Sequence, residues 1–183
     1  MPTKSTKNPP GSAELSGKSG GTAPGLKLAL QRAARASGVP LRADFRKWIK
    51  AALARDAEIV LRIVNESEGR QLNRDFRHKD YATNVLTFVY DDSRILCGDI
   101  VLCAPVIEKE AMQQHKDLAA HYAHLTVHGV LHLQGHEHDN DASAAVMERL
   151  EAEILGKLGY VNPYEVHPAA GDTASGKNEV HHA

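Results

Sequence analysis

The segment HGVLHLQGHEHD, residues 128–139, constrains this chain more than any other part of it. Four of the 11 histidines of the chain lie within it. His128 and His132 are four residues apart in an apolar stretch that favours a helix, so both imidazoles should lie on one helix face, one turn apart. This spacing allows two imidazoles to share a single metal ion.

A glycine and further histidines follow this pair. Gly135 can adopt the left-handed conformation that ends a helix, so that the chain turns back and a third imidazole approaches the first two. His138 and His136 are both candidates for it. We favour His138, because His136 follows the glycine at once and leaves little chain for the turn. Three protein ligands and one open position are typical of a catalytic zinc site rather than a structural one.

The spacing H-x-x-x-H-x-x-G-x-x-H also occurs in the metzincin proteases. In those enzymes the residue after the first histidine is the glutamate that activates water. Here this position is Gly129. A peptidase mechanism would lack its proton acceptor, which argues against a metzincin protease.

The charge of the chain argues against a protein that binds polyanions over its whole surface, but one local basic patch is present. The formal net charge is −1, so no global field attracts a polyanion, and a phosphate site would have to be local. Arg70, Arg74, Arg77 and Lys79 form such a basic cluster, which could contact several phosphates. A guanidinium donates two parallel hydrogen bonds that match a phosphate.

Cysteine usage and hydropathy indicate the compartment. The only two cysteines, Cys97 and Cys103, do not make a disulfide framework and suggest reduced thiols in a cytosolic protein. No apolar run reaches the roughly 18 residues that span a bilayer. Residues 1–25 contain no apolar core of a secretory signal. We therefore expect a cytoplasmic protein with no membrane partner.

Composition and hydrophobic periodicity predict the domain organisation. The chain is 42% apolar and 25% charged, which is typical of a globular protein. Residues 1–25 and 167–183 are rich in small and polar residues, so we expect disordered N-terminal and C-terminal tails around a single domain over 26–166.

Within this domain the pattern predicts helices and strands in the order α-β-α-β-β-α-α-α. The helices are expected at 41–55, 67–76, 106–133 (as two helices broken near 114–118) and 141–158. The strands are expected at 58–64, 84–90 and 99–105, with a turn over 91–99 in which Gly98 is the breaker. This order favours an α+β fold, a small mixed β-sheet packed with several α-helices, with the metal site on a helix and the turn after it.

Three blocks of the sequence resemble one known family. HGVLHLQGHEH closely resembles the signature H-G-x-L-H-L-x-G-[YF]-D-H of the YbeY family, the bacterial metal-dependent endoribonucleases of ribosomal RNA maturation. LNRDFRHKDYATNVLTF (72–88) and GDIVLCAPVIEKEA (98–111) resemble two further blocks of that family, and the likeness spans roughly 58–164. The departures are Glu137 for the usual aspartate, His136 for an aromatic residue and Val89 for proline.

The resemblance implies a hydrolase specific for single-stranded RNA that takes part in 16S rRNA 3′-end maturation and ribosome quality control. It implies one Zn²⁺ on His128, His132 and His138, and Arg77 as the catalytic arginine. The implied partners are single-stranded RNA, ribosomal RNA and the small ribosomal subunit, and we expect no DNA partner.

Further residues complete the expected site. Arg70, Arg74 and Lys79 are candidate RNA contacts, and Glu137 and Asp139 could orient a ligating imidazole by accepting its other N–H. The alternative is a non-catalytic, metal-stabilised ribosome assembly factor, in which a fourth protein ligand would close the site. The sequence offers no convincing fourth ligand, because both cysteines belong to a distant predicted strand, and this favours the enzyme.

Overall fold

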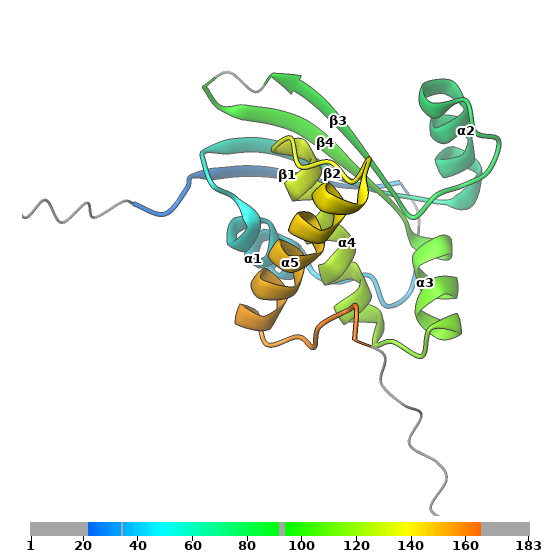
Figure 1. Cartoon of the computed structure of the whole chain (residues 1–183). Coiled ribbons are helices and arrows are strands. Elements are labelled where there is room, and N and C mark those ends of the chain that lie inside the picture. Colours follow the sequence, from blue (N-terminus) through cyan, green and yellow to red (C-terminus); the bar gives the residue numbers. More distant parts are fainter. Residues whose placement is uncertain (1–21, 34, 92–93, 166–183) are drawn as a thin grey trace, which may run out of the picture.

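The computed structural model describes residues 22–165, apart from 34 and 92–93. Over this part of the chain, helices pack on both faces of a four-stranded mixed sheet with the strand order β1-β2-β4-β3 (Figure 1). The strands are β1 (Leu26–Arg32), β2 (Ala57–Val64), β3 (Val85–Asp91) and β4 (Leu96–Cys103). The helices are α1 (Arg42–Ala52), α2 (Glu66–Arg77), α3 (Ala104–Gln113), α4 (Leu118–Leu133) and α5 (Asp141–Lys157). The prediction of an α+β fold with a small mixed sheet is confirmed.

One strand was not predicted. β1 pairs in parallel with β2, and α1 makes the crossover between them. It is an edge strand, and of its apolar residues only Leu28 is fully buried, whereas Leu26 and Leu30 are half-buried. Its leucines do alternate along the strand, but Ala29 between two of them blurs the apolar–polar pattern that identifies a strand.

The predicted turn over 91–99 is wrong in its second half. β4 already begins at Leu96, and Gly98 lies inside it, paired with Val89 of the antiparallel β3. Glycine is needed there for packing, because a Cβ would lie 2.6 Å from the carbonyl oxygen of Phe88 and 2.9 Å from Leu133. The strand predicted to reach residue 105 ends at Cys103 instead. Pro105 lies in the first turn of α3, where a missing N–H has no consequence.

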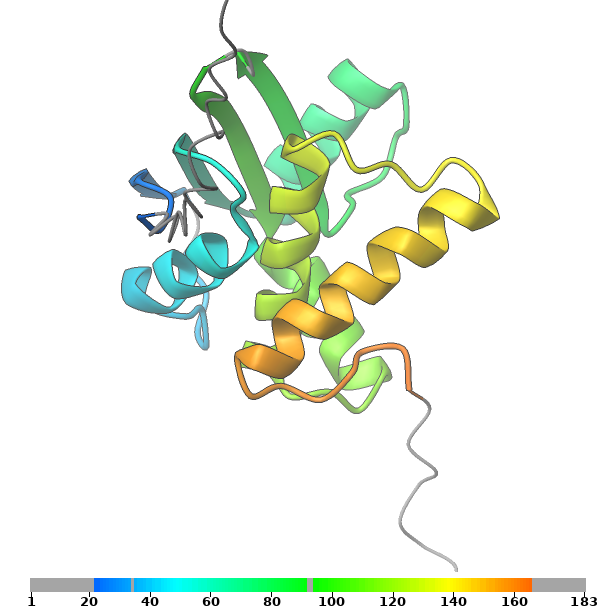
Figure 2. The ribbon, with the colours of Figure 1, turned by 60° about the vertical axis from the view of Figure 1, so that its left-hand side comes forward.

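The main core lies between one face of the sheet and the helices α1, α4 and α5. α4 packs on β3 and β4 of the sheet, with α1 beside it, and α5 packs on the outer side of α4 (Figure 2). Phe45 and Ile49 of α1, Leu61 of β2 and Ile100 of β4 are fully buried in this core. This arrangement holds α4, the helix with the histidine segment, between the sheet and α5.

In the part of the chain that the structure describes, helices cover the opposite face of the sheet at one end only. There α2 contributes Leu72 to a smaller apolar cluster with Val64, Val101 and Cys103. Cys103 is buried and Cys97 is half-buried, and both are free thiols, as predicted.

The expected tails mostly fall outside the described residues. Residues 1–21 and 166–183 lie there, and residues 22–25 lead directly into β1. Among the helices of the described part of the chain, none combines the length and apolar character that crossing a bilayer requires.

Candidate metal centre and cleft

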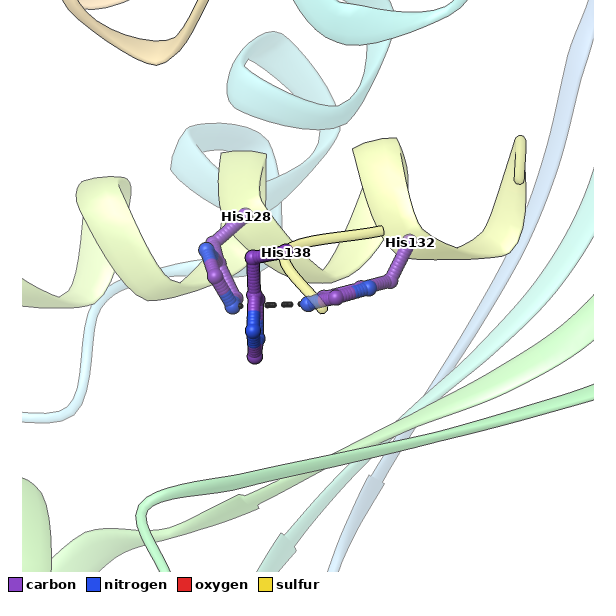
Figure 3. Close-up of side chains that lie close together, drawn as sticks. All are labelled: His128, His132 and His138. Atoms are coloured by element: carbon purple, nitrogen blue, oxygen red, sulfur yellow. Dashed lines mark hydrogen bonds between the residues drawn. The ribbon is translucent and has the colours of Figure 1, made fainter. Parts of the chain in front are cut away.

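Three of the predicted histidines converge on one point (Figure 3). His128 and His132 come from α4, and His138 comes from the loop that follows it. The Nε2 atoms of His128 and His132 are 3.0 Å apart, and one ring nitrogen of each of the three residues lies within 4.8 Å of the others. Two nitrogen ligands of a tetrahedral zinc ion are about 3.3 Å apart. The donor set and its spacing therefore fit a divalent metal of the zinc type.

The glycine turn is built as the sequence predicts. α4 ends at Leu133, and Gly135 has a φ of 89°. Its N–H donates to the carbonyl of His132 (3.0 Å), and the N–H of His136 donates to the carbonyl of Leu131 (3.1 Å), which together form a Schellman motif. His136 lines a different depression, whereas His138 faces the other two imidazoles. Of the two candidates for the third position, the structure brings His138 to the pair.

Tight packing explains the residue after the first histidine. A Cβ at Gly129 would lie 3.2 Å from Ile100 and 3.4 Å from Thr87, because α4 contacts the sheet closely at this point. A glutamate at this position would have to push the side chains of Ile100 and Thr87 aside. The departure from the protease motif therefore follows from how the helix is seated.

The surroundings of His132 keep its imidazole neutral. Burial, together with the neighbouring His128 and His138, lowers the pKa of His132 to about 4. A neutral imidazole with a lone pair is the form that binds a metal ion. The cluster is thus ready to bind a cation at neutral pH without losing a proton from His132.

The histidines of α4 form a longer stripe than the metal motif alone. His121 and His124 precede His128 on the same helix face, and neighbouring rings are in edge-to-face contact. His121 Nε2 lies 2.8 Å from Glu110 Oε2, and His124 Nε2 lies 3.1 Å from Glu151 Oε2. Carboxylates of α3 and α5 therefore pair with one ring nitrogen of each of these two histidines.

Glu151 is the residue that sequence reasoning missed. Its side chain is 0% exposed, and its carboxylate contacts His128 Nδ1 and the Tyr164 hydroxyl as well as His124. Burial alone would raise the pKa of Glu151, but these hydrogen bonds lower it to about 2. A signal did exist: Glu151 is four residues from each of Met147 and Leu155, which are buried, so a carboxylate stands on the buried face of α5.

The two acidic residues predicted to orient a ligand lie further away. Glu137 Oε2 is 3.9 Å from His132 Nδ1, which is too long for a hydrogen bond. Asp139 lines the cleft beside the cluster.

The histidines open into a polar cleft of about 420 Å³. Arg77, the last residue of α2, lines this cleft together with the start of β3. Its guanidinium makes no ion pair with any residue in the described ranges. The complete lining is Arg77, Thr83, Asn84, Val85, Thr87, Val89, His128, His132, Glu137, His138 and Asp139.

The remaining predicted cations lie outside the cleft and are exposed. Arg70 binds Asp80 with two parallel hydrogen bonds of 2.9 and 2.8 Å. Arg74 lies 3.5 Å from Asp75. Two arginines of the basic cluster are thus partly neutralised, while Arg77 and Lys79 have no carboxylate within ion-pair distance in the described part of the chain.

Fold and site together define an α+β protein with three converging histidines in a cleft that also holds an arginine. Comparison with known proteins identifies its family: the sequence model described as "Endoribonuclease YbeY" matches residues 31–159. The chain belongs to this family.

Curated relatives agree with this assignment over most of their length. The chain is 56% identical over 169 residues to the endoribonuclease YbeY of Nitrosomonas europaea, covering 91% of this chain and 99% of the relative. It is 60% identical over 154 residues to the protein of the same name in Nitrosospira multiformis, covering 76% of this chain and 82% of the relative.

Proposed function

We propose that this chain is a zinc-dependent endoribonuclease that cuts single-stranded RNA, with His128, His132 and His138 as the metal ligands and Arg77 as the catalytic arginine. Endoribonuclease activity follows from membership in the family. The observation that carries the finer proposal is the convergence of three imidazoles in a cleft shared with Arg77.

The chemistry needed is displacement at phosphorus, in which charge builds up on the phosphoryl oxygens. A zinc ion held by His128, His132 and His138 would supply a Lewis acid that polarises these oxygens and activates water. Arg77, which lines the same cleft as the histidines, binds the scissile phosphate by donating two parallel N–H groups to its oxygens. It holds the phosphate in place and stabilises the charge that develops there.

Asn84 adds a fixed acceptor to the same cleft. Its Nδ2 donates to both carboxylate oxygens of Glu110, each at 3.1 Å, which fixes the orientation of the amide. Glu110 is held in turn by His121. The amide oxygen of Asn84 then remains to accept a hydrogen bond from an RNA hydroxyl or amino group.

We place the path of the RNA along α2 toward the cleft. Arg70, Arg74 and Lys79 are exposed on this path and would contact phosphates. Because Arg70 and Arg74 already have acidic neighbours, each contributes less to affinity than Arg77.

The substrate we propose is ribosomal RNA, cut during 16S 3′-end maturation and ribosome quality control in the cytoplasm, with the small ribosomal subunit as partner. The three sequence blocks that resemble the YbeY family support this assignment.

Cleavage of single-stranded RNA by purified variants tests the proposal. His132→Ala should lose zinc and cleavage together. Arg77→Ala should keep zinc and cut about 10²- to 10³-fold more slowly, as expected when a donor to the transition state is removed. His136→Ala and Arg149→Ala are the matched controls, since both residues lie outside the cleft, and they should keep both properties.

Two outcomes would contradict the proposal. Equal cleavage by all variants would exclude these residues from the reaction. If the zinc-loaded wild type cleaves nothing but binds ribosomal particles, the chain is an assembly factor instead.

A further inference from the structure

A fully buried carboxylate lies behind the histidine cluster. Glu151, in the middle of α5, is 0% exposed and is one of four buried polar or charged residues in the described part of the chain. Taking an isolated carboxylate out of water is strongly unfavourable unless hydrogen bonds replace the lost solvation. A sequence that keeps a carboxylate at this position therefore needs a reason beyond packing, which an apolar residue would serve as well.

Both oxygens of Glu151 face hydrogen-bond donors. Oε1 contacts His128 Nδ1. Oε2 contacts the Tyr164 hydroxyl and lies 3.1 Å from His124 Nε2. His124 and His128 belong to α4 and Tyr164 to the segment after α5, so two separate parts of the chain hold this one carboxylate in place.

The two ring nitrogens of His128 therefore have different partners. Nδ1 faces Glu151, and Nε2 faces His132 Nε2 at 3.0 Å inside the cluster. A carboxylate can only accept, so Nδ1 must carry the proton, and Nε2 then presents its lone pair to the cluster. Histidine ligands of metal ions commonly donate their other N–H to a carboxylate, which fixes the tautomer and the ring plane.

The other two histidines lack this support. Glu137 is 3.9 Å from His132 Nδ1 and largely exposed, and His138 has no carboxylate within ion-pair distance among the residues that the structure describes. His124, His128 and Glu151 also lie close enough together to hold a metal ion. The hydrogen bonds between Glu151 and the two histidines already explain this proximity.

We propose that Glu151 is a positioning residue of the metal centre: held by Tyr164 and His124, it accepts the Nδ1–H of His128 and thereby aims the Nε2 lone pair at the metal. This inference rests on the proposed function of the three histidines as metal ligands. It makes Glu151 of α5 and Tyr164 of the segment after it part of the site, although neither supplies a ligand.

The first test is the tautomer of His128 in the metal-free protein, measured by ¹⁵N NMR of the imidazole rings. The wild type should show the Nδ1–H form. In Glu151→Gln the amide can donate as well as accept, so a substantial Nε2–H population should appear at His128. A residue that only fills space would leave the tautomer unchanged, so a pure Nδ1–H signal in the folded variant would overturn the proposal.

The second test is zinc affinity, measured by competition with a chelator. Glu151→Gln should bind zinc about 10- to 100-fold more weakly, the range typical when a carboxylate partner of a ligating histidine is lost. Glu153→Gln, on the same helix, is the matched control and should change affinity less than threefold, because its exposed carboxylate pairs with Lys157 outside the cleft. Equal affinities for the wild type and Glu151→Gln would also overturn the proposal.

A third variant covers the case in which Glu151→Gln does not fold. Tyr164→Phe removes one donor to Oε2 from a partly exposed residue and should weaken zinc binding several-fold. Tyr160→Phe, four residues earlier, is its control, since the Tyr160 ring packs on Trp48 away from the carboxylate. Unchanged affinity in Tyr164→Phe would then count against the positioning role. Failure of the wild type itself to bind zinc would instead refute the proposed function.

Discussion

Replacing Gly135 by alanine should weaken metal binding through backbone strain alone. Gly135 has a φ of 89°, and a Cβ added there would meet no heavy atom within 4 Å. The added Cβ would therefore not clash with neighbouring residues. The cost that is left comes from the left-handed backbone conformation, which disfavours a residue with a Cβ by about 1–2 kcal/mol. This strain falls on the turn that brings His138 to His128 and His132.

Bound metal determines whether this strain lowers the unfolding free energy or the zinc affinity. Without metal, the exposed turn after α4 can relax to another conformation, and the unfolding free energy should fall by less than about 1 kcal/mol. With metal, three ligands hold the turn in place, so the strain that the metal-free protein relieves should appear as weaker zinc binding, by up to about 2 kcal/mol or roughly 30-fold.

Gly159 offers a matched control within the same chain. It also has a φ of 89°, has open space around it, and follows a helix in a Schellman motif, with Tyr160 N–H donating to Leu155. Contact of Tyr160 with the buried Trp48 holds this turn whether or not metal is bound. Gly159→Ala should therefore lower the unfolding free energy by about 1–2 kcal/mol and leave zinc affinity unchanged.

Chelator competition for zinc and urea unfolding of the metal-free variants measure the two effects separately. Unchanged zinc affinity in Gly135→Ala would refute the argument, as would identical behaviour of the two variants in both assays.

Four further outcomes are expected. Removing zinc from protein saturated at ~1,000 times Kd should lower the stability by about 4 kcal/mol and the melting temperature by roughly 10 °C, and an unchanged midpoint with metal loss verified would contradict a metal site. Gly98→Ala should lower the unfolding free energy by about 1–3 kcal/mol in urea unfolding, since its Cβ would lie 2.6 Å from the Phe88 carbonyl; wild-type stability would show that β3 yields freely. Burial would raise the pKa of Glu110, but hydrogen bonds from His121 and Asn84 hold this pKa below the usual 4.5. The stability that Glu110 contributes is therefore present above about pH 4.5 and is lost as the pH falls through the lower pKa of the folded state. Urea unfolding across this range should show a shallower pH dependence in Glu110→Gln, and an identical slope would refute the assignment. Burial raises the pKa of the Cys103 thiol, so a thiol reagent should modify Cys97 first and Cys103 only on unfolding, and equal rates would contradict the packing of α2 on β4.

Local sequence patterns predicted those parts of the site that depend on chain neighbours. The spacing of His128 and His132 and the backbone freedom of Gly135 are properties of a short segment, and the structure arranges all three as expected. The helices were predicted for the same reason, since each carries its own apolar periodicity. The break between α3 and α4 also lies within residues 114–118, as predicted.

The sequence could not predict features that depend on residues far apart in the chain. The environment of Glu151 is set by His128, 23 positions earlier on another helix, and by Tyr164 beyond the end of its own helix. Gly98 looks like a turn residue until the close approach of Phe88 and Leu133 is known. β1 is half-exposed at the sheet edge, so its pattern is weak. In each case the deciding contact joins residues that the sequence does not place together.

X-ray absorption of the zinc-loaded protein tests most directly whether three imidazoles hold one ion and leave a position open. We expect a first shell of three imidazole nitrogens at about 2.0–2.1 Å and one oxygen from water or phosphate. A sulfur ligand at about 2.3 Å, or a fourth protein ligand in place of the exchangeable oxygen, would contradict it.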